Sequence, residues 1–164
     1  MSLVIRALGP EDADAFRDLR LEALRMSPEA FGSTYEVESA RPPEFFVQRL
    51  AGSTVFGGFV GDTLLGMAGF HQEEGLKDRH KAMLWGLYVR PAARGSGLSR
   101  GLVDAVLDHA RGRVEQVTLA VIVDNEAAHR LYVAAGFVQY GLQPEALKQN
   151  GRYYDERLMV AMLR

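Results

Sequence analysis

The chain has 164 residues, 48% of them hydrophobic, which is enough for one core and too few to suggest two. Its formal net charge of −2 lacks the basic excess of a phosphate-backbone binder, so we expect no nucleic-acid partner. The absence of cysteine excludes disulfides, thiolate metal sites and a cysteine nucleophile. The four histidines lack short metal-ligand spacing, so we expect no metal; they are His71, His80, His109 and His129.

No apolar run approaches the roughly 18 residues of a membrane span, and the first residues lack a signal core. We therefore expect a cytoplasmic protein without a membrane partner, formed as one domain over residues 1–164.

Residues 3–8 are apolar and β-branched at their centre, which predicts a strand. Ala13, Phe16, Leu19 and Ala23 recur at helical spacing and predict a helix over residues 11–26. Residues 31–43 are predicted to be irregular, and 43–51 a short helix opened by proline.

The remaining segments predict a sheet interrupted by two helices. Residues 54–60 and 64–74 are apolar runs separated by Gly61-Asp62-Thr63, which predicts an antiparallel hairpin. Residues 81–89, 117–123, 137–142 and 152–163 are predicted strands. Helices are predicted from Gly97 to Ala110 and over residues 125–136. The pattern predicts an α/β fold with a mixed, mostly antiparallel sheet of about seven strands, four helices and one parallel crossover.

Residues 94–99, which we call the glycine loop, join the strand at 81–89 to the following helix. At this join, unpaired N–H groups and the helix dipole favour a bound anion, and Arg94 adds bidentate donors. A mononucleotide P-loop would need Lys-Ser/Thr after its last glycine, and this chain has no such pair there. A dinucleotide fingerprint fits the glycine spacing poorly, although Asp124, at the end of the next predicted strand, keeps this interpretation open. A plain glycine-rich turn and a coenzyme A pyrophosphate loop also remain as interpretations.

Two motifs resemble those of the GNAT superfamily of N-acetyltransferases. "VRPAARGSGLSRGL" is similar to its pyrophosphate motif, with serine at position 99 where glycine or alanine is usual. "NEAAHRLYVAAGF" is similar to its segment N-x-x-A-x-x-L-Y-x-x-x-G-F. The resemblance implies a GNAT fold across the chain and transfer of an acetyl group from acetyl-CoA to a primary amine. A non-catalytic acyl-CoA-binding module is the alternative.

The resemblance also implies roles for individual residues. The backbone of the strand at 87–89 would pair with the pantetheine arm and offer an N–H to the thioester oxygen. Tyr132 would protonate the departing thiolate, while Asn125 would bind the cofactor or cap its helix. The expected cofactor-binding residues are Leu87, Tyr88, Val89, Arg94, Gly95, Ser96, Gly97, Leu98, Ser99, Asn125 and Tyr132.

The general base is harder to assign. An amine with a pKa near about 10 is mostly protonated at neutral pH, so its attack on a thioester requires proton removal. Many family members use a glutamate on the fourth strand, but residues 81–89 contain no acid. We take Glu73 as the nominal choice. The other candidates are Glu36, Glu38, His71, Glu74, Asp155 and Glu156.

The acceptor is expected to bind against residues 31–43 and 142–154. Glu36 and Glu38 would favour a cationic amine, whereas Arg41, Lys148 and Arg152 would favour one that carries a carboxylate. A small amine, an amino acid and a peptide or protein N-terminus therefore all remain open as substrates, and a homodimer remains open as the assembly. Because the chain has no cysteine to carry the acyl group, we expect direct attack in a ternary complex.

Overall fold

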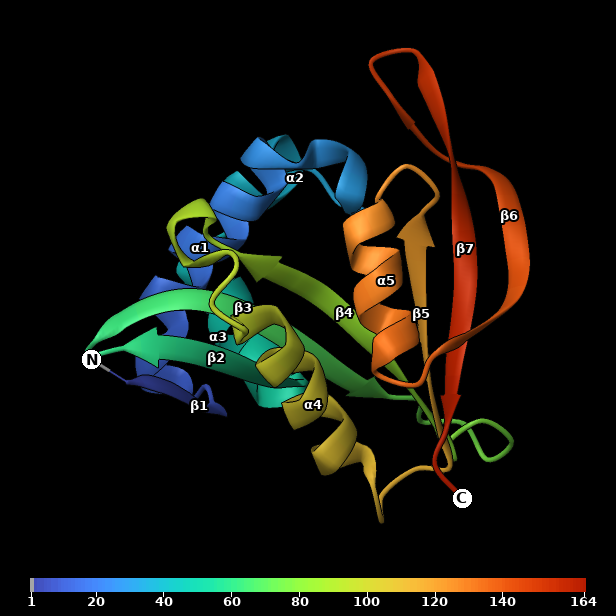
Figure 1. Cartoon of the computed structure of the whole chain (residues 1–164). Helices are drawn as coiled ribbons and strands as arrows, with labels where there is room; N and C mark the ends of the chain where they lie inside the picture. Colours follow the sequence, from blue (N-terminus) through green and yellow to red (C-terminus); the bar gives the residue numbers. More distant parts are fainter. Residues whose placement is uncertain (1) are drawn as a thin grey trace.

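The computed structural model describes residues 2–164, which form one seven-stranded sheet (Figure 1). Its spatial order is β1-β2-β3-β4-β5-β7-β6, and every neighbouring pair is antiparallel except β4 and β5. This arrangement confirms the predicted fold class. The strands are β1 (Leu3–Ala7), β2 (Thr54–Val60), β3 (Thr63–Gln72), β4 (Lys81–Val89), β5 (Gln116–Ile122), β6 (Val138–Gln149) and β7 (Arg152–Met162).

Helices cover both faces of the sheet and enclose two cores (Figure 1). On one face, α1 and α3 bury Phe16, Leu19 and Phe46 against β2 and β3. On the other face, α4 buries Leu102 and Val106 in a core to which α5 contributes Tyr132. The helices are α1 (Ala13–Met26), α2 (Tyr35–Ser39), α3 (Pro43–Gly52), α4 (Leu98–Ala110) and α5 (Glu126–Ala134), with 3-10 turns at Pro10–Asp12, Pro28–Ala30 and Pro91–Ala93.

The short helix α2 lies in the segment predicted to be irregular. Thr34 caps it by accepting a hydrogen bond from the Val37 amide at 3.2 Å. Glu38, near its end, is only 1% exposed and pairs with Arg20 of α1. A helix of five residues is not stable by itself. The ion pair with Arg20 therefore stabilises α2, which the local sequence did not predict.

Strand β6 is longer than the strand predicted over residues 137–142 and continues past Leu142 to Gln149. Its pairing with β7 shifts register between Gln143 and Leu147, and the amide of Glu145 donates to Asp155 Oδ1 at 2.8 Å. Pairing with β7 thus carries the strand past Pro144, which local propensity disfavours. The two strands meet at Asn150-Gly151, where both residues have positive φ as a two-residue hairpin turn requires.

Strands β4 and β5 begin side by side and then diverge (Figure 1). They pair only between Lys81–Met83 and Gln116–Thr118. A bulge contributes to the separation, because Gly86 and Leu87 of β4 together oppose the single residue Ala68 of β3. The divergence opens the sheet between the carboxyl ends of two parallel strands, which is a frequent position for ligand sites in α/β folds.

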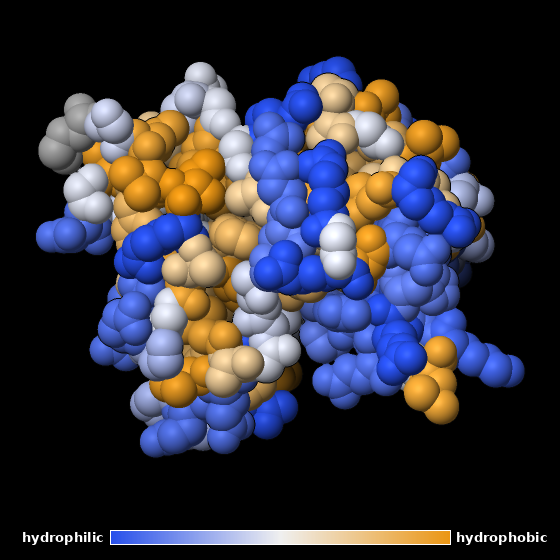
Figure 2. Space-filling view, turned by 90° about the horizontal axis from the view of Figure 1, so that it is seen from below, coloured by the Kyte–Doolittle hydropathy of each residue, from blue (hydrophilic) through white to orange (hydrophobic). Residues whose placement is uncertain are grey.

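Figure 2 shows the surface at the end of the molecule where β4 and β5 are paired. There, apolar patches are interrupted by polar residues, and a notch separates two halves of the surface (Figure 2). Of residues 2–164, no segment forms a helix long and apolar enough to cross a membrane. Within the same residues, no group of three or more His, Asp or Glu side chains is arranged to hold a metal ion.

Candidate functional site

A cleft of about 820 Å³ fills the gap between β4 and β5. One wall is formed by residues 84–89 of β4 and the other by residues 119–122 of β5. The first turns of α5, the glycine loop, Ser27–Phe31 and two residues of β7 complete the lining. The split in the sheet therefore brings together segments from six parts of the chain.

The β4 wall presents its backbone to the cleft. Leu87 and Val89 pack towards the α4 core, whereas Tyr88 packs towards α1 and donates a hydrogen bond to Glu22 Oε2 at 2.9 Å. Burial, then the hydrogen bond to Glu22, raises the pKa of Tyr88. Because these side chains are committed to the two cores, the amides and carbonyls of the diverging strand are what a bound molecule would meet.

The glycine loop lies at one end of the cleft, where α4 begins. Arg94, Gly95 and Ser99 line the cleft, while Gly97 is the N-cap of α4 at φ +87°. Leu98 is 1% exposed, so its side chain belongs to the core. Ser96 Oγ donates to the Ala93 carbonyl at 2.5 Å and accepts from the Leu98 amide at 3.4 Å. The loop itself is thus held by Ser96.

This end of the cleft fits a pyrophosphate. Gly95 and Gly97 both have positive φ, and a Cβ built on either would meet no atom within 4 Å. Glycine is therefore required here for backbone conformation rather than for lack of space. Successive amides and the helix dipole of α4 favour an anion at this point. Arg94 is held beside it by a hydrogen bond from Nε to the Val89 carbonyl at 3.2 Å.

The opposite wall carries Asn125 and Tyr132 of α5. Asn125 caps the helix, since its Oδ1 accepts a hydrogen bond from the Ala128 amide at 3.1 Å, and it also lines the cleft. Tyr132 is 6% exposed and packs edge-on against Phe137. Burial raises the pKa of Tyr132 above its ordinary value. The phenol therefore keeps its proton at neutral pH and can act as a donor.

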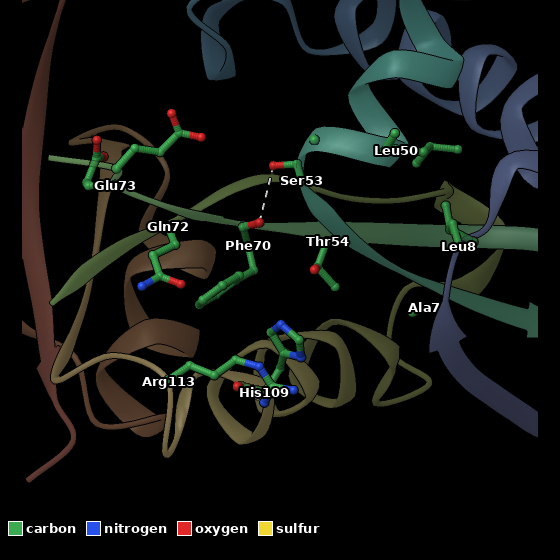
Figure 3. Close-up of a pocket in the computed structure, with 13 residues that line it drawn as sticks. Ala7, Leu8, Leu50, Ser53, Thr54, Phe70, Gln72, Glu73, His109 and Arg113 are labelled. Atoms are coloured by element: carbon green, nitrogen blue, oxygen red, sulfur yellow. Dashed lines mark hydrogen bonds between the residues drawn. The ribbon is translucent and has the colours of Figure 1, made fainter. Parts of the chain in front are cut away.

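Glu73 is not among the residues that line this cleft. Its amide donates to the Lys81 carbonyl at 3.0 Å, at the end of β4 where β4 and β5 are still paired. It lines a separate cavity of about 530 Å³, across from His109 and Arg113 (Figure 3). The structure does not bring Glu73 and Tyr132 together, because the antiparallel pairing of β3 and β4 places residue 73 beyond the closed end of the gap.

The other candidate bases also lie outside the cleft lining, which does not include Glu36, Glu38, His71, Glu74, Asp155 or Glu156. Burial acts to raise the pKa of Glu38, but hydrogen bonds and charge from Arg20, with Ser33 and Arg49, hold it below its usual range. Asp155 accepts a backbone hydrogen bond, and His71 Nδ1 lies 3.4 Å from Ser53 Oγ. Burial raises the pKa of Glu156.

Two carboxylates do line the cleft, Glu29 and Asp124. Asp124 is paired with Arg152 at 2.6 Å, whereas no ion pair or hydrogen bond of the Glu29 side chain is found in residues 2–164. Glu29 lies in the 3-10 turn Pro28–Ala30, between the predicted helix and the predicted irregular segment. Pro28, at the start of this turn, could have indicated a turn from the sequence. Only tertiary packing brings the turn to the cleft.

The comparisons with known proteins agree with this geometry. The model of the Acetyltransferase (GNAT) family matches residues 15–137. N-alpha-acetyltransferase RimI of Mycobacterium tuberculosis is 36% identical over 112 residues, which are 67% of this chain and 69% of that protein. A spermidine N(1)-acetyltransferase of Vibrio cholerae is 32% identical over 82 residues, 49% of this chain and 47% of that enzyme.

Solved structures show the same fold. YncA of Salmonella typhimurium, determined with its cofactor acetyl-CoA, superposes with a TM-score of 0.86 at 23% identity, covering 100% of this chain and 95% of that chain. The chain belongs to the GNAT family of acetyltransferases. The resemblance drawn from its two motifs is confirmed.

Proposed function

We propose that this protein transfers an acetyl group from acetyl-CoA to a primary amine by direct attack in a ternary complex. The observation that carries the proposal is the cleft itself, which joins the glycine loop at the start of α4, the diverging strand β4 and the buried Tyr132. Family membership supports acetyl transfer, and the acetyl-CoA in the Salmonella structure supports the donor. The names of two relatives, an N-alpha-acetyltransferase and a spermidine N(1)-acetyltransferase, support an amine acceptor.

Each part of the cleft has a role in this proposal. The glycine loop and Arg94 hold the pyrophosphate, and the β4 backbone positions the pantetheine arm. Bound acetyl-CoA supplies a thioester carbonyl that an amine can attack. The amides beside the bulge donate to its oxygen as negative charge develops. Tyr132 donates its proton towards the departing sulfur from the α5 wall.

The base in this proposal is Glu29, in place of Glu73. Glu29 lines the cleft and has no cationic partner within the part of the chain that the structure describes. A carboxylate in that position can receive the ammonium proton directly or through one water. Asp124 is less suited to this role, because Arg152 stabilises its charged form.

We expect Glu29→Gln to lower kcat/KM on the order of 10²-fold at pH 7, because it removes the proton acceptor without changing size. The rising limb of the pH–rate profile should shift to higher pH, towards the pKa of the amine itself. Rates are measured between pH 5 and 9 with one amine. Glu73→Gln is measured in the same series, and a larger loss there than in Glu29→Gln would return the role to Glu73.

The proposed reaction is tested by thiol release from acetyl-CoA against a panel of primary amines. Initial rates with both substrates varied should give intersecting double-reciprocal lines, since attack occurs in a ternary complex. Parallel lines would contradict direct attack. Tight acetyl-CoA binding by calorimetry without thiol release for any amine would favour the acyl-CoA-binding module instead.

A further inference from the structure

A buried ion pair lies directly behind the acceptor side of the cleft. Arg20 of α1 is 6% exposed, and its Nε and Nη2 each donate to Glu38 at 3.0 Å. Arg49 of α3 approaches Glu38 at 3.6 Å. Buried ion pairs contribute little net stability, because desolvation opposes their attraction. The pair holds α2 against α1, and the charge of Arg20 that it keeps beside Phe31 and Trp85 can serve a second task.

The Arg20 guanidinium is surrounded by residues that also line the cleft. Its Cζ lies 5.3 Å from the ring centre of Phe31 and 5.8 Å from that of Trp85. Its Nη1 lies 3.7 Å from the position that a Cβ on Gly86 would occupy. Phe31, Trp85 and Gly86 all line the cleft. Gly86 therefore places no side chain between the β4 backbone and the guanidinium, and within residues 2–164, leaving aside Gly86 and its two chain neighbours, Nη1 is the atom that lies within 4 Å of that position.

The hydrogen bonds leave Nη1 available. Glu38 occupies Nε and Nη2, and no hydrogen bond from Nη1 is found in residues 2–164. The cluster of Arg20, Arg49 and Glu38 also carries one more positive than negative charge. Of the two arginines that line the cleft, Arg152 is neutralised by Asp124 and Arg94 lies at the glycine loop. Arg20 is not itself in the cleft lining; it lies behind Gly86, with Nη1 3.7 Å from the position that a side chain there would occupy.

We propose that Arg20 recognises a carboxylate on the acceptor beside Gly86, where β4 carries no side chain over Nη1, so that the substrate is a small primary amine that carries a carboxylate. This inference rests on the proposed function and narrows its acceptor. Glu38 fixes the guanidinium plane with two hydrogen bonds, and the rings of Phe31 and Trp85 pack near it. A planar guanidinium held in this way presents a charge-assisted donor to a carboxylate. Polyamines and peptide N-termini lack that carboxylate beside their amine.

The test compares L-amino acids with their α-carboxamides in the thiol-release assay. The ratio of kcat/KM for acid over amide is measured in the wild type and in the double variant Arg20→Met/Glu38→Gln, which removes both charges of the bidentate pair together and leaves the 27% exposed side chain of Arg49 without its carboxylate. We expect the ratio to fall about tenfold to a hundredfold in the double variant, mainly through KM for the acid. Comparing ratios between proteins cancels the different basicity of the two amines.

A second variant and a control make the result specific. Gly86→Ala places a methyl group 3.7 Å from Nη1 and should also lower the ratio; because alanine is strained at its φ of +69°, the rate with the carboxamide reports any change in the β4 backbone. Arg49→Gln removes the other positive charge of the cluster but leaves Arg20 paired with Glu38, and should lower the ratio far less than the double variant does. Thermal unfolding and acetyl-CoA affinity establish that each variant is folded.

Equal ratios in all proteins, or a wild type that prefers spermidine or peptide N-termini over amino acids, would overturn this inference and leave the acetyltransferase proposal intact. If no amine at all stimulates thiol release, the proposed function and the inference fall together.

Discussion

We expect Tyr132→Phe to lower kcat on the order of 10² to 10⁴-fold while acetyl-CoA affinity changes little. The substitution removes one hydroxyl and keeps the ring that packs edge-on against Phe137. Burial holds the pKa of Tyr132 above its ordinary value, so the wild-type phenol remains protonated throughout the neutral pH range. The lost group is therefore a proton donor and not a charge. Turnover is measured with saturating acetyl-CoA and amine, and affinity by calorimetry.

The control for this result is Tyr140→Phe, the same change on a tyrosine of β6 that is 59% exposed. It should leave kcat unchanged. The defect of Tyr132→Phe should shrink with an acyl donor whose thiol is more acidic, since that leaving group needs less help from a proton. Near wild-type turnover in Tyr132→Phe, with chemistry rate-limiting, would mean that the tyrosine only packs the helix face.

The second large effect concerns the glycine loop. We expect Arg94→Ala to weaken acetyl-CoA binding about tenfold to a hundredfold, because it removes a charge-assisted donor next to the α4 N-terminus. Gly97→Val should weaken binding as well, since a β-branched residue is strained at the N-cap φ of +87° and would shift the loop amides. Both dissociation constants are measured by calorimetry, with thermal unfolding as the check on folding.

Arg100→Ala provides the matched comparison for Arg94. Arg100 lies in the first turn of α4, where it pairs with Asp104 at 3.0 Å on the exposed face and does not line the cleft. Its removal should leave acetyl-CoA affinity nearly unchanged. Unchanged affinity in both Arg94→Ala and Gly97→Val would show that the pyrophosphate binds elsewhere.

The order of the elements could be predicted from the chain because each rests on a local pattern. Phe16 and Leu19 repeat at helical spacing, and the turns at Gly61-Asp62 and Asn150-Gly151 have the residues that hairpins need. The short helix α2 and the second half of β6 could not be predicted in this way. Glu38 stabilises α2 only by meeting Arg20, and residues 143–149 form a strand only because β7 pairs with them.

The sequence by itself determined the parts of the site whose geometry is local. The glycine loop and the Asn125 cap lie on continuous segments, where residue spacing sets the conformation. Only the tertiary structure decided which distant side chains share the cleft. The register of β3 against β4 places Glu73 beyond its closed end, whereas the packing of Pro28–Ala30 brings Glu29 to its wall. Such placements depend on strand pairing and helix packing between segments far apart in the chain, and local propensity carries no information about them.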